Sequence, residues 1–341
     1  MRIFPPLSLP SRPDTRSGPA NTRAAADSGG APIAYPFSRY APALLLFLLA
    51  LHLSLPGLQP SAFGLPPVRV VSQTVGNDEI LLAVAAPSQI AALSHLSRDA
   101  SFTAVAAQAA AFPRLDKNAT AESILAYSPT LVIFTDYSRA ELVEQVRRAG
   151  VRIVIIKNYH VLADAYDNLR LIAAELGPDA EARAARIIAD CEARVAALRA
   201  RLAGAKPVRV IAPSTYGMIP GGDSTFQDLC DHAAAENLAA TLGGLRGHEP
   251  PPSEKMLTWP VDKVVLVSSE PGAKDPAQAA LAPFLKLPPY QFMPAIRERR
   301  VALLEPWQIS CVSHHRVTAY ERLARELHPE CFAASGAEPA Q

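Results

Sequence analysis

The feature that most constrains the fold of this chain is a long amphipathic segment in the middle of the sequence. Residues 179–204 read DAEARAARIIADCEARVAALRARLAG and follow Gly177-Pro178, which interrupts an earlier helical pattern at 161–176. Apolar residues in the segment recur at steps of three and four (Ala184, Ile187, Cys191, Val195, Leu198 and Leu202). This spacing predicts one helix of about 24 residues, about 36 Å long. A connection between neighbouring strands needs less, so the helix is expected to bridge two parts of the molecule.

On both sides of the bridging helix, short apolar runs alternate with helical patterns. Before it, strands are predicted at 68–72, 89–95, 130–134 and 151–157, with helices at 77–85, 121–128 and 138–150. After it, strands are predicted at 208–213, 262–269 and 300–306, with helices at 224–240, 253–259 and 313–329. Such alternation is typical of mainly parallel sheets covered by helices. The predicted fold is therefore α/β, with two Rossmann-like lobes joined by one long bridging helix.

The first 64 residues are predicted to be a signal or targeting segment. Residues 41–57 read APALLLFLLALHLSLPG, an apolar run too short for a typical membrane span, and Ala62 and Gly64 form a small-x-small cleavage site. An uncleaved membrane anchor is the alternative. The expected organisation is a segment at 1–64, an N-terminal lobe at 65–160, a helical linker at 161–205, a C-terminal lobe at 206–332 and a disordered tail at 333–341.

The composition excludes some partners and leaves the cysteines open. The chain of 341 residues has a net charge of +1 and no block of Lys and Arg, which argues against nucleic acid. The four cysteines (Cys191, Cys230, Cys311 and Cys331) show no C-x-x-C spacing, so neither a zinc ribbon nor a thioredoxin-type site is indicated. An exported protein permits disulfides, but four cysteines allow three pairings. The position of Cys191 on the apolar stripe of the helix favours a buried free thiol.

Four stretches together resemble one family. They read VVSQTVGNDEILLAV, NATAESILAYSPTLVIF, GGDSTFQDLCDHAAAENLA and SEKMLTWPVDKVVLV, in this order and around the bridging helix. They are similar to elements of the iron-siderophore and cobalamin class of periplasmic substrate-binding proteins, the soluble receptors of ABC importers with a helical backbone (class III). Thr130 replaces the usual Asp of the second element, and Ala235 stands where Gly is common in the third. The resemblance covers about residues 68–330.

The resemblance implies a binding protein without a cofactor and without catalytic activity. It would capture a metal chelate (cobalamin, a ferric siderophore or haem) between its lobes in the periplasm and deliver it to the permease of an ABC importer, as a monomer in solution. The family carries one exposed Glu on each lobe that pairs with Arg of the permease, and Glu122 and Glu254 occupy those positions. Both would also suit the first turn of a helix, where the helix dipole favours an acidic residue.

Ligands of such sheets bind at the carboxyl ends of the strands. The loops that follow the predicted strands supply the candidate ligand-binding residues (Ser72, Gln73, Thr74, His95, Asp136, Tyr137, Tyr159, Tyr216, Trp307, His314 and His315). Aromatic faces combined with a few polar groups suit a large, flat, partly apolar ligand. Core packing is the alternative for the aromatic residues and is favoured for Phe226 and Trp259.

The stretch SCVSHHRV at 310–317 raises the question of a metal site. Ser313 is a good N-cap residue, so His314 and His315 are expected in the first turn of the last helix, where the helix dipole favours the neutral imidazole. Neighbouring residues diverge by about 100° around a helix, so only one of the two should face a ligand.

Two other functions stay open. A chelatase-like enzyme could insert a metal into a tetrapyrrole, although export argues against it. A receptor for bare zinc or manganese could use His95, His160 and His314, although no His-x-x-x-His spacing supports it.

Overall fold

The structure is a computed structural model that describes residues 67–268 and 272–333. The chain divides at Gly64 into two units, and the predicted targeting segment in the first unit lies outside the described residues. In the described ranges no helix is both long and apolar enough to cross a membrane.

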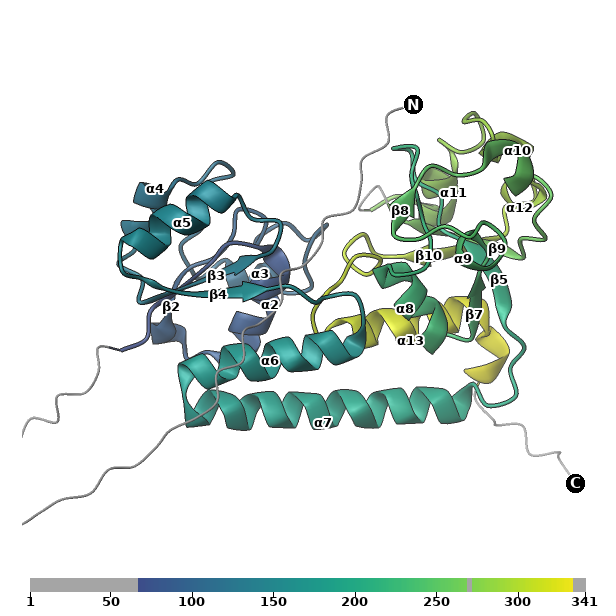
Figure 1. Cartoon of the computed structure of the whole chain (residues 1–341). Coiled ribbons are helices and arrows are strands. Elements are labelled where there is room, and N and C mark those ends of the chain that lie inside the picture. Colours follow the sequence, from purple (N-terminus) through teal and green to yellow (C-terminus); the bar gives the residue numbers. More distant parts are fainter. Residues whose placement is uncertain (1–66, 269–271, 334–341) are drawn as a thin grey trace, which may run out of the picture. The chain divides into compact units, whose positions relative to one another are not determined.

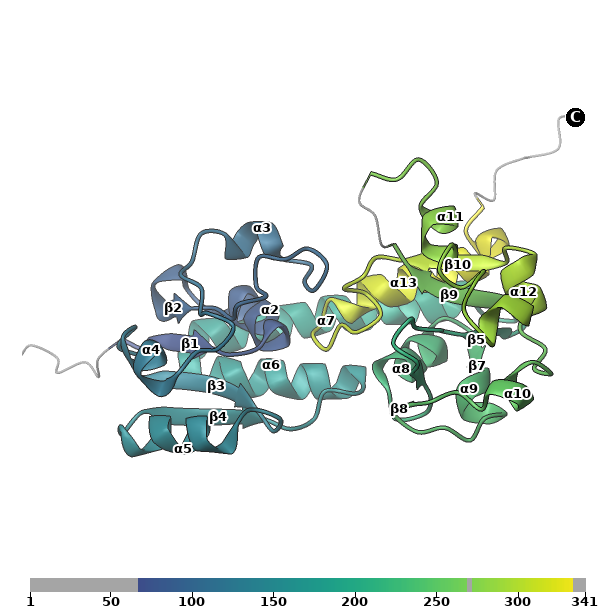
Figure 2. The same cartoon turned by 90° about the horizontal axis from the view of Figure 1, so that it is seen from above.

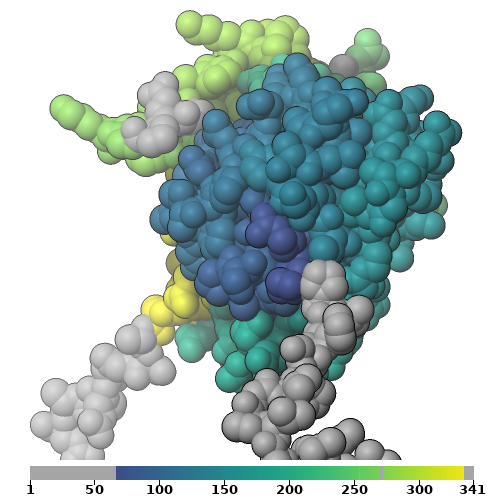
Figure 3. Space-filling model, turned by 90° about the vertical axis from the view of Figure 1, so that its left-hand side faces the viewer, coloured from purple at the N-terminus to yellow at the C-terminus, as the bar shows by residue number. Residues whose placement is uncertain are grey.

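Residues 67–160, here called lobe 1, form a parallel sheet in the order β2-β1-β3-β4 (Figure 1). Its strands are β1 (Val70–Ser72), β2 (Ile90–Ala92), β3 (Leu131–Thr135) and β4 (Arg152–Ile156). Its helices are α2 (Val75–Val84), α3 (Ala106–Ala109), α4 (Ala121–Leu125) and α5 (Ala140–Arg148). The blue atoms at the front of Figure 3 belong to this lobe.

The sheet of lobe 1 is covered on both faces. Val70 and Ile133 are buried among residues of α2, α6 and α7, whereas Val71 and Phe134 are buried among residues of α4 and α5. Neighbouring residues of a strand point to opposite faces, so apolar strands without alternation are required here.

Helices α6 (Leu162–Leu176) and α7 (Pro178–Arg201) pack side by side (Figures 1 and 2). α7 has 24 residues, as the apolar spacing predicts. Its first half, with Ala184 and Ile188, is buried in the core of lobe 1, and its second half, with Cys191 and Leu198, is buried in the core of the second lobe. One helix therefore contributes to two cores, which confirms the bridging helix.

Residues 206–333, here called lobe 2, repeat the topology of lobe 1. The sheet has the order β10-β9-β5-β7, and in both lobes the order along the sheet is second, first, third and fourth strand. The strands are β5 (Val208–Ile211), β6 (Ile219–Pro220), β7 (Ala235–Asn237), β8 (His248–Glu249), β9 (Lys263–Val267) and β10 (Val301–Leu304), with β6 and β8 forming a separate pair. The helices are α8 (Thr225–His232), α9 (Leu238–Thr241), α10 (Ser253–Met256), α11 (Pro276–Leu281), α12 (Pro294–Arg297) and α13 (Arg316–Leu327). Short 3₁₀ turns occur at Pro87–Gln89, Tyr290–Phe292 and Pro329–Cys331. The predicted α/β class with two parallel sheets is confirmed.

The single helix predicted at 224–240 is wrong. α8 ends at His232, Ala234 adopts a left-handed backbone with φ of 50°, and β7 follows as an edge strand that pairs with β5. A left-handed residue ends a helix because the chain can no longer continue the i to i−4 hydrogen bonds. Asn237 then caps α9 by accepting a hydrogen bond from the backbone N–H of Ala239 at 3.2 Å.

Candidate functional site

Three of the candidate ligand-binding residues are the last residue of β1, Ser72, and the two residues after it, Gln73 and Thr74, and they have different environments. Ser72 is fully buried, and its hydroxyl donates to the carbonyl oxygen of Thr74 at 3.3 Å. Thr74 immediately precedes α2 and makes no side-chain cap. Gln73 alone lines a cavity. In this structure Ser72 therefore supports the turn, and Gln73 is the one of the three that lines a cavity.

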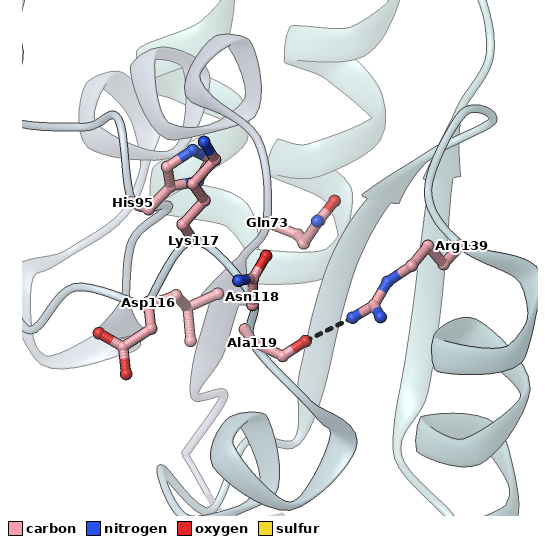
Figure 4. A pocket seen from close by; sticks show the side chains of 8 residues that line it. Gln73, His95, Asp116, Lys117, Asn118, Ala119 and Arg139 are labelled. Atoms are coloured by element: carbon pink, nitrogen blue, oxygen red, sulfur yellow. Dashed lines mark hydrogen bonds between the residues drawn. The ribbon is translucent and has the colours of Figure 1, made fainter.

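That cavity lies at the carboxyl ends of β1 and β2 and has a volume of about 260 Å³. Besides Gln73 it is lined by His95, a predicted site residue, and by the loop before α4 with Arg139 opposite (Leu115, Asp116, Lys117, Asn118, Ala119 and Arg139) (Figure 4). Arg139 donates to the carbonyl oxygen of Ala119 at 2.7 Å. The lining of this lobe-1 cavity is therefore mainly polar.

A second group of candidates lies where β3 and β4 end. The hydroxyl of Tyr159 donates to Asp136 at 3.2 Å, and the Tyr159 ring meets the Tyr137 ring edge-on with centroids 5.9 Å apart. Burial and the Asp136 carboxylate raise the pKa of Tyr159. The ring centroids of His160 and Tyr159 lie 4.9 Å apart. Tyr137 is 65% exposed, so this cluster presents an aromatic face to solvent.

Lobe 2 contains an apolar cavity of about 390 Å³ at the carboxyl ends of β5 and β9. Tyr216 lines it and is 91% exposed. Met218, Phe226, Phe284 and Ile309 are among its apolar walls. Trp259 is buried in the core, as predicted, whereas Phe226 is buried and also borders the cavity. Trp307, the remaining aromatic candidate, is half-buried and is not part of this lining.

The two adjacent histidines do not lie in a helix, contrary to the prediction. α13 begins at Arg316, and Ser313 does not cap it. The Ser313 hydroxyl instead donates to Glu79 of α2 at 2.5 Å and accepts from the backbone N–H of His315 at 3.2 Å. The rings of His314 and His315 lie together, with centroids 4.1 Å apart. His315 is the N-cap residue of α13 and has helical dihedrals (φ -64°, ψ -14°), whereas His314 lies in the turn before it, so the divergence expected within a regular helix does not apply to this pair.

Burial determines the charge of this histidine pair. His314 is only 9% exposed, and burial lowers its pKa to about 3, with the neighbouring His315 adding to the effect. Burial also lowers the pKa of His315. Both imidazoles are neutral at pH 7, as predicted, but the cause is desolvation instead of a helix dipole. The Nδ1 atom of His314 is buried and lacks a hydrogen-bond partner in the described part of the chain.

Glu79 joins the two lobes. It is 3% exposed, and it accepts from Thr103 at 2.7 Å and from the backbone N–H of Ala104 at 3.0 Å, both in lobe 1. Its other carboxylate oxygen accepts from Ser313 and from the Cys311 thiol, both in lobe 2. The adjacent Asp78 is fully buried, and desolvation raises its pKa to about 7.

Arg316 makes a second connection between the lobes. It is fully buried, and its guanidinium donates to the carbonyl oxygens of Tyr159 and His160 at 3.1 Å. It also donates to the carbonyl oxygen of Cys311 at 2.9 Å and to the carboxylate of Asp228 at 3.0 Å. The backbone of the predicted site residue Tyr159 is therefore held by a side chain of lobe 2.

The two glutamates predicted to contact a permease have equivalent positions. Glu122 is exposed in the first turn of α4, and Glu254 is exposed in the first turn of α10. Each lies nine residues before a strand, Glu122 before Leu131 of β3 and Glu254 before Lys263 of β9. A hydrogen bond from the Thr120 side chain lowers the pKa of Glu122. The helix position alone explains an acidic residue at both places.

The sequence did not identify several residues of these sites. Lys117 and Arg139 enter the lobe-1 cavity from segments that were predicted only as a loop and a helix start. Glu79 and Arg316 each bind partners that are distant in the sequence, Glu79 in the loop before α13 and Arg316 in lobe 1. For Arg316, its place next to two histidines at the predicted start of the last helix was an available signal. In residues 67–268 and 272–333 no three His, Cys, Asp or Glu side chains form a group that could hold a metal ion. His95, His160 and His314 are therefore not assembled into a metal site in this structure.

All four cysteines are free. Burial raises the pKa of the Cys191 thiol to about 11 and of the Cys311 thiol to about 12. The prediction of a buried free thiol at Cys191 is confirmed.

Known proteins provide the last observation. No curated protein matches the sequence. Among solved structures, the periplasmic haem-binding protein RhuT of Roseiflexus sp. RS-1 is similar with 22% identity and a TM-score of 0.65, over 78% of this chain and 100% of that one. A periplasmic haem-binding protein of Pseudomonas aeruginosa shares 22% identity with a TM-score of 0.62, over 77% and 94%. The Helicobacter pylori protein CeuE, solved with Ni(II) bound, shares 16% identity with a TM-score of 0.62, over 80% and 87%.

These neighbours share the two-lobed fold, and at such identities the likeness concerns the fold alone. The sequence itself is matched by a family model. The model described as periplasmic binding protein matches residues 70–306, more than half of the chain. Together with the two parallel sheets and the bridging helix, this match establishes that the chain belongs to the periplasmic binding protein family.

Proposed function

We propose that this chain is the exported substrate-binding component of an ABC importer, which captures a metal chelate and delivers it to the membrane permease. The candidate chelates are cobalamin, a ferric siderophore and haem. RhuT and the Pseudomonas aeruginosa protein are described as haem-binding, and CeuE was solved with Ni(II) bound, which supports a metal-containing ligand.

The apolar cavity of lobe 2 is the observation that carries the proposal. An aromatic ring that is 91% exposed, Tyr216, stands beside walls formed by Met218, Phe226 and Phe284. Covering such a surface with a large, flat ligand removes apolar area from water, which contributes about 25 cal/mol per Å² before the cost of association is subtracted. Small polar metabolites gain little from this surface, whereas a macrocyclic chelate matches it.

The polar and aromatic groups of lobe 1 would complete the site. We include Gln73, His95, Asp136, Tyr137 and Tyr159 among the residues that contact the chelate. Hydrogen bonds to backbone and side chains already orient several of them, and such preorganisation reduces the entropy lost on binding. Thr74, Trp307, His314 and His315 remain proposed contacts of the chelate.

A titration tests the proposed function. The chain from residue 65 onward is mixed with cyanocobalamin, haemin or a ferric siderophore, and absorbance is recorded at increasing ligand concentration. We expect saturable binding of one chelate at one molecule per chain, without change of the chelate over hours. Insertion of a metal into a free tetrapyrrole would indicate a chelatase-like enzyme. Saturable binding of zinc or manganese with no affinity for any chelate would indicate a bare-ion receptor.

We further propose that Glu122 and Glu254 contact the permease. Their matching positions on two lobes of identical topology suit a symmetric partner, and both side chains are exposed. Replacing each with Gln should leave chelate affinity unchanged and reduce uptake by cells that express the transporter. Glu141→Gln, an exposed first-turn acid of α5, is the matched control. If Glu122→Gln or Glu254→Gln weakens chelate binding itself, the residue belongs to the ligand site and the docking assignment is wrong.

A further inference from the structure

The lobe-1 cavity differs in chemistry from the apolar cavity of lobe 2. We propose that it is an anion subsite, which binds a carboxylate group carried by the chelate. This inference rests on the proposed function and narrows its ligand class to chelates with acidic groups at their edge.

Charge is the first argument. Lys117 and Arg139 line the cavity, and Asp116 is the one acidic residue of the lining, so its Lys, Arg and Asp side chains together carry a charge of +1. In Figure 4 the Asp116 carboxylate points away from Gln73 and Arg139. Within the described chain no carboxylate lies within ion-pairing distance of Lys117 or Arg139. Glu122 and Glu141 line a neighbouring hollow that Arg139 also lines. Their negative charges reduce the positive potential around Arg139 without forming an ion pair with it.

The hydrogen bonds of Gln73 provide the second argument. Ser138 accepts a hydrogen bond from the backbone N–H of Thr135 at 3.1 Å, so its own proton is available to the Gln73 side chain, and it donates to Oε1 of Gln73 at 2.9 Å. This bond fixes the amide orientation, since the oxygen faces Ser138 and the NH₂ group keeps its two donors. The Gln73 amide is thus prepared to donate to an acceptor.

Arg139 is oriented in a similar way. One terminal nitrogen donates to the carbonyl oxygen of Ala119 at 2.7 Å, which anchors the guanidinium beside the loop that carries Lys117 and Asn118. A guanidinium has five N–H donors, so further donors remain for a ligand. Gln73, Lys117 and Arg139, which all carry N–H donors, therefore line one cavity of about 260 Å³, a volume suited to a small acidic group and too small for a whole macrocycle.

The two cavities then have separate roles. The lobe-2 cavity contributes apolar contact, which is insensitive to the charge of the ligand edge. The lobe-1 cavity would discriminate between chelates with and without a carboxylate at their edge, because a hydrogen bond from a charged donor to a carboxylate is stronger than one to a neutral acceptor. Chelates with carboxylates at the periphery should bind more tightly than the same chelates with those groups esterified.

Haemin and its dimethyl ester provide the test, because the ester keeps the macrocycle and the iron but lacks the carboxylates. We expect haemin to bind the unaltered chain about ten- to hundredfold more tightly than the ester, the range for hydrogen bonds to charged groups. Lys117→Gln and the double variant Lys117→Gln/Arg139→Gln should weaken haemin and leave the ester unchanged. The matched control is Arg186→Gln/Lys206→Gln, which removes two exposed positive charges outside both cavities.

Citrate alone, titrated by calorimetry, is the second probe. We expect saturable binding that the double variant loses and the control keeps; Lys117 is exposed, so Lys117→Gln gives a readout even if Arg139→Gln fails to fold. If haemin and its ester bind equally and Lys117→Gln changes neither, the subsite is refuted while the proposed function stands. If no chelate binds and citrate shows the expected pattern, the proposed function is refuted while the subsite stands. Absence of both refutes both.

Discussion

Replacing Arg316 with Met should destabilise the protein more than any substitution of a surface charge. The Arg316 side chain is fully buried. In its ion pair with Asp228 the two side chains are 0% and 4% exposed. Removing one partner of such a buried pair costs about 3–5 kcal/mol, because the remaining charge is left without compensation. In Arg316→Met the Asp228 carboxylate would keep a hydrogen bond from Tyr320, and the His232 imidazole, with Nδ1 3.7 Å from Oδ1 of Asp228, would be the basic side chain left beside it.

The assay is urea unfolding at pH 7, followed by fluorescence of the buried Trp259. Arg147→Met is the control: its ion pair with Glu144 lies on one helix with side chains 54% and 43% exposed, and solvent screens such an exposed pair, so its loss should change stability little. Arg316→Met/Asp228→Asn should be less destabilised than Arg316→Met alone, since it removes the uncompensated charge. If Arg316→Met loses no more free energy of unfolding than Arg147→Met, the reasoning about the buried pair is wrong.

Three further predictions concern single side chains. Burial lowers the pKa of His314 from 6.5 to about 3. Between these two pH values the unfolded chain therefore binds one more proton at this residue than the folded chain. The free energy of unfolding should fall as the pH drops from 6.5 towards 3, by up to about 1.4 kcal/mol per pH unit. His314→Gln should therefore lose less stability than the unaltered chain between pH 7 and pH 5 in urea unfolding, and an equal loss would contradict the assignment. Burial raises the pKa of Asp78 to about 7, so the effect of pH on stability has the opposite sign at this residue. The protonated carboxyl stabilises the fold at low pH, and this contribution is lost as the pH rises to 7. Asp78→Asn should remove that loss between pH 4 and pH 7, as measured in the same assay. Tyr216→Ala should weaken chelate binding in the absorbance titration and leave the free energy of unfolding unchanged, because the ring is 91% exposed; unaltered affinity would exclude Tyr216 from the site.

The elements that the sequence predicted well are those with a long or uniform apolar pattern. α7 matches its predicted length because an apolar stripe over seven turns admits one interpretation, and its burial in both cores follows from that stripe. β7 was missed because a strand of three residues between two Ala-rich helical segments has no pattern of its own. Its position is determined by pairing with β5, which is a tertiary effect.

The site was predictable only in part, for a similar reason. The rule that ligand residues follow strand ends led to Gln73, His95 and Tyr216, which do line cavities. It could not show that Ser313 would donate to Glu79 rather than cap α13, because that choice depends on a residue more than two hundred positions away. Local capping preference and a buried carboxylate competed for the same hydroxyl, and the buried carboxylate prevailed because an unsatisfied charge in the interior costs more than a lost cap.

The most direct measurement of the central claim uses protein purified from its native medium. Its absorbance spectrum should show a coloured metal complex, since corrins, haem and ferric chelates absorb at different wavelengths. Denaturation should release that complex intact, at one molecule per chain, as identified by mass spectrometry. A colourless protein that also fails to take up any chelate in titration, or one that releases a chemically altered complex, would contradict a binding protein for metal chelates.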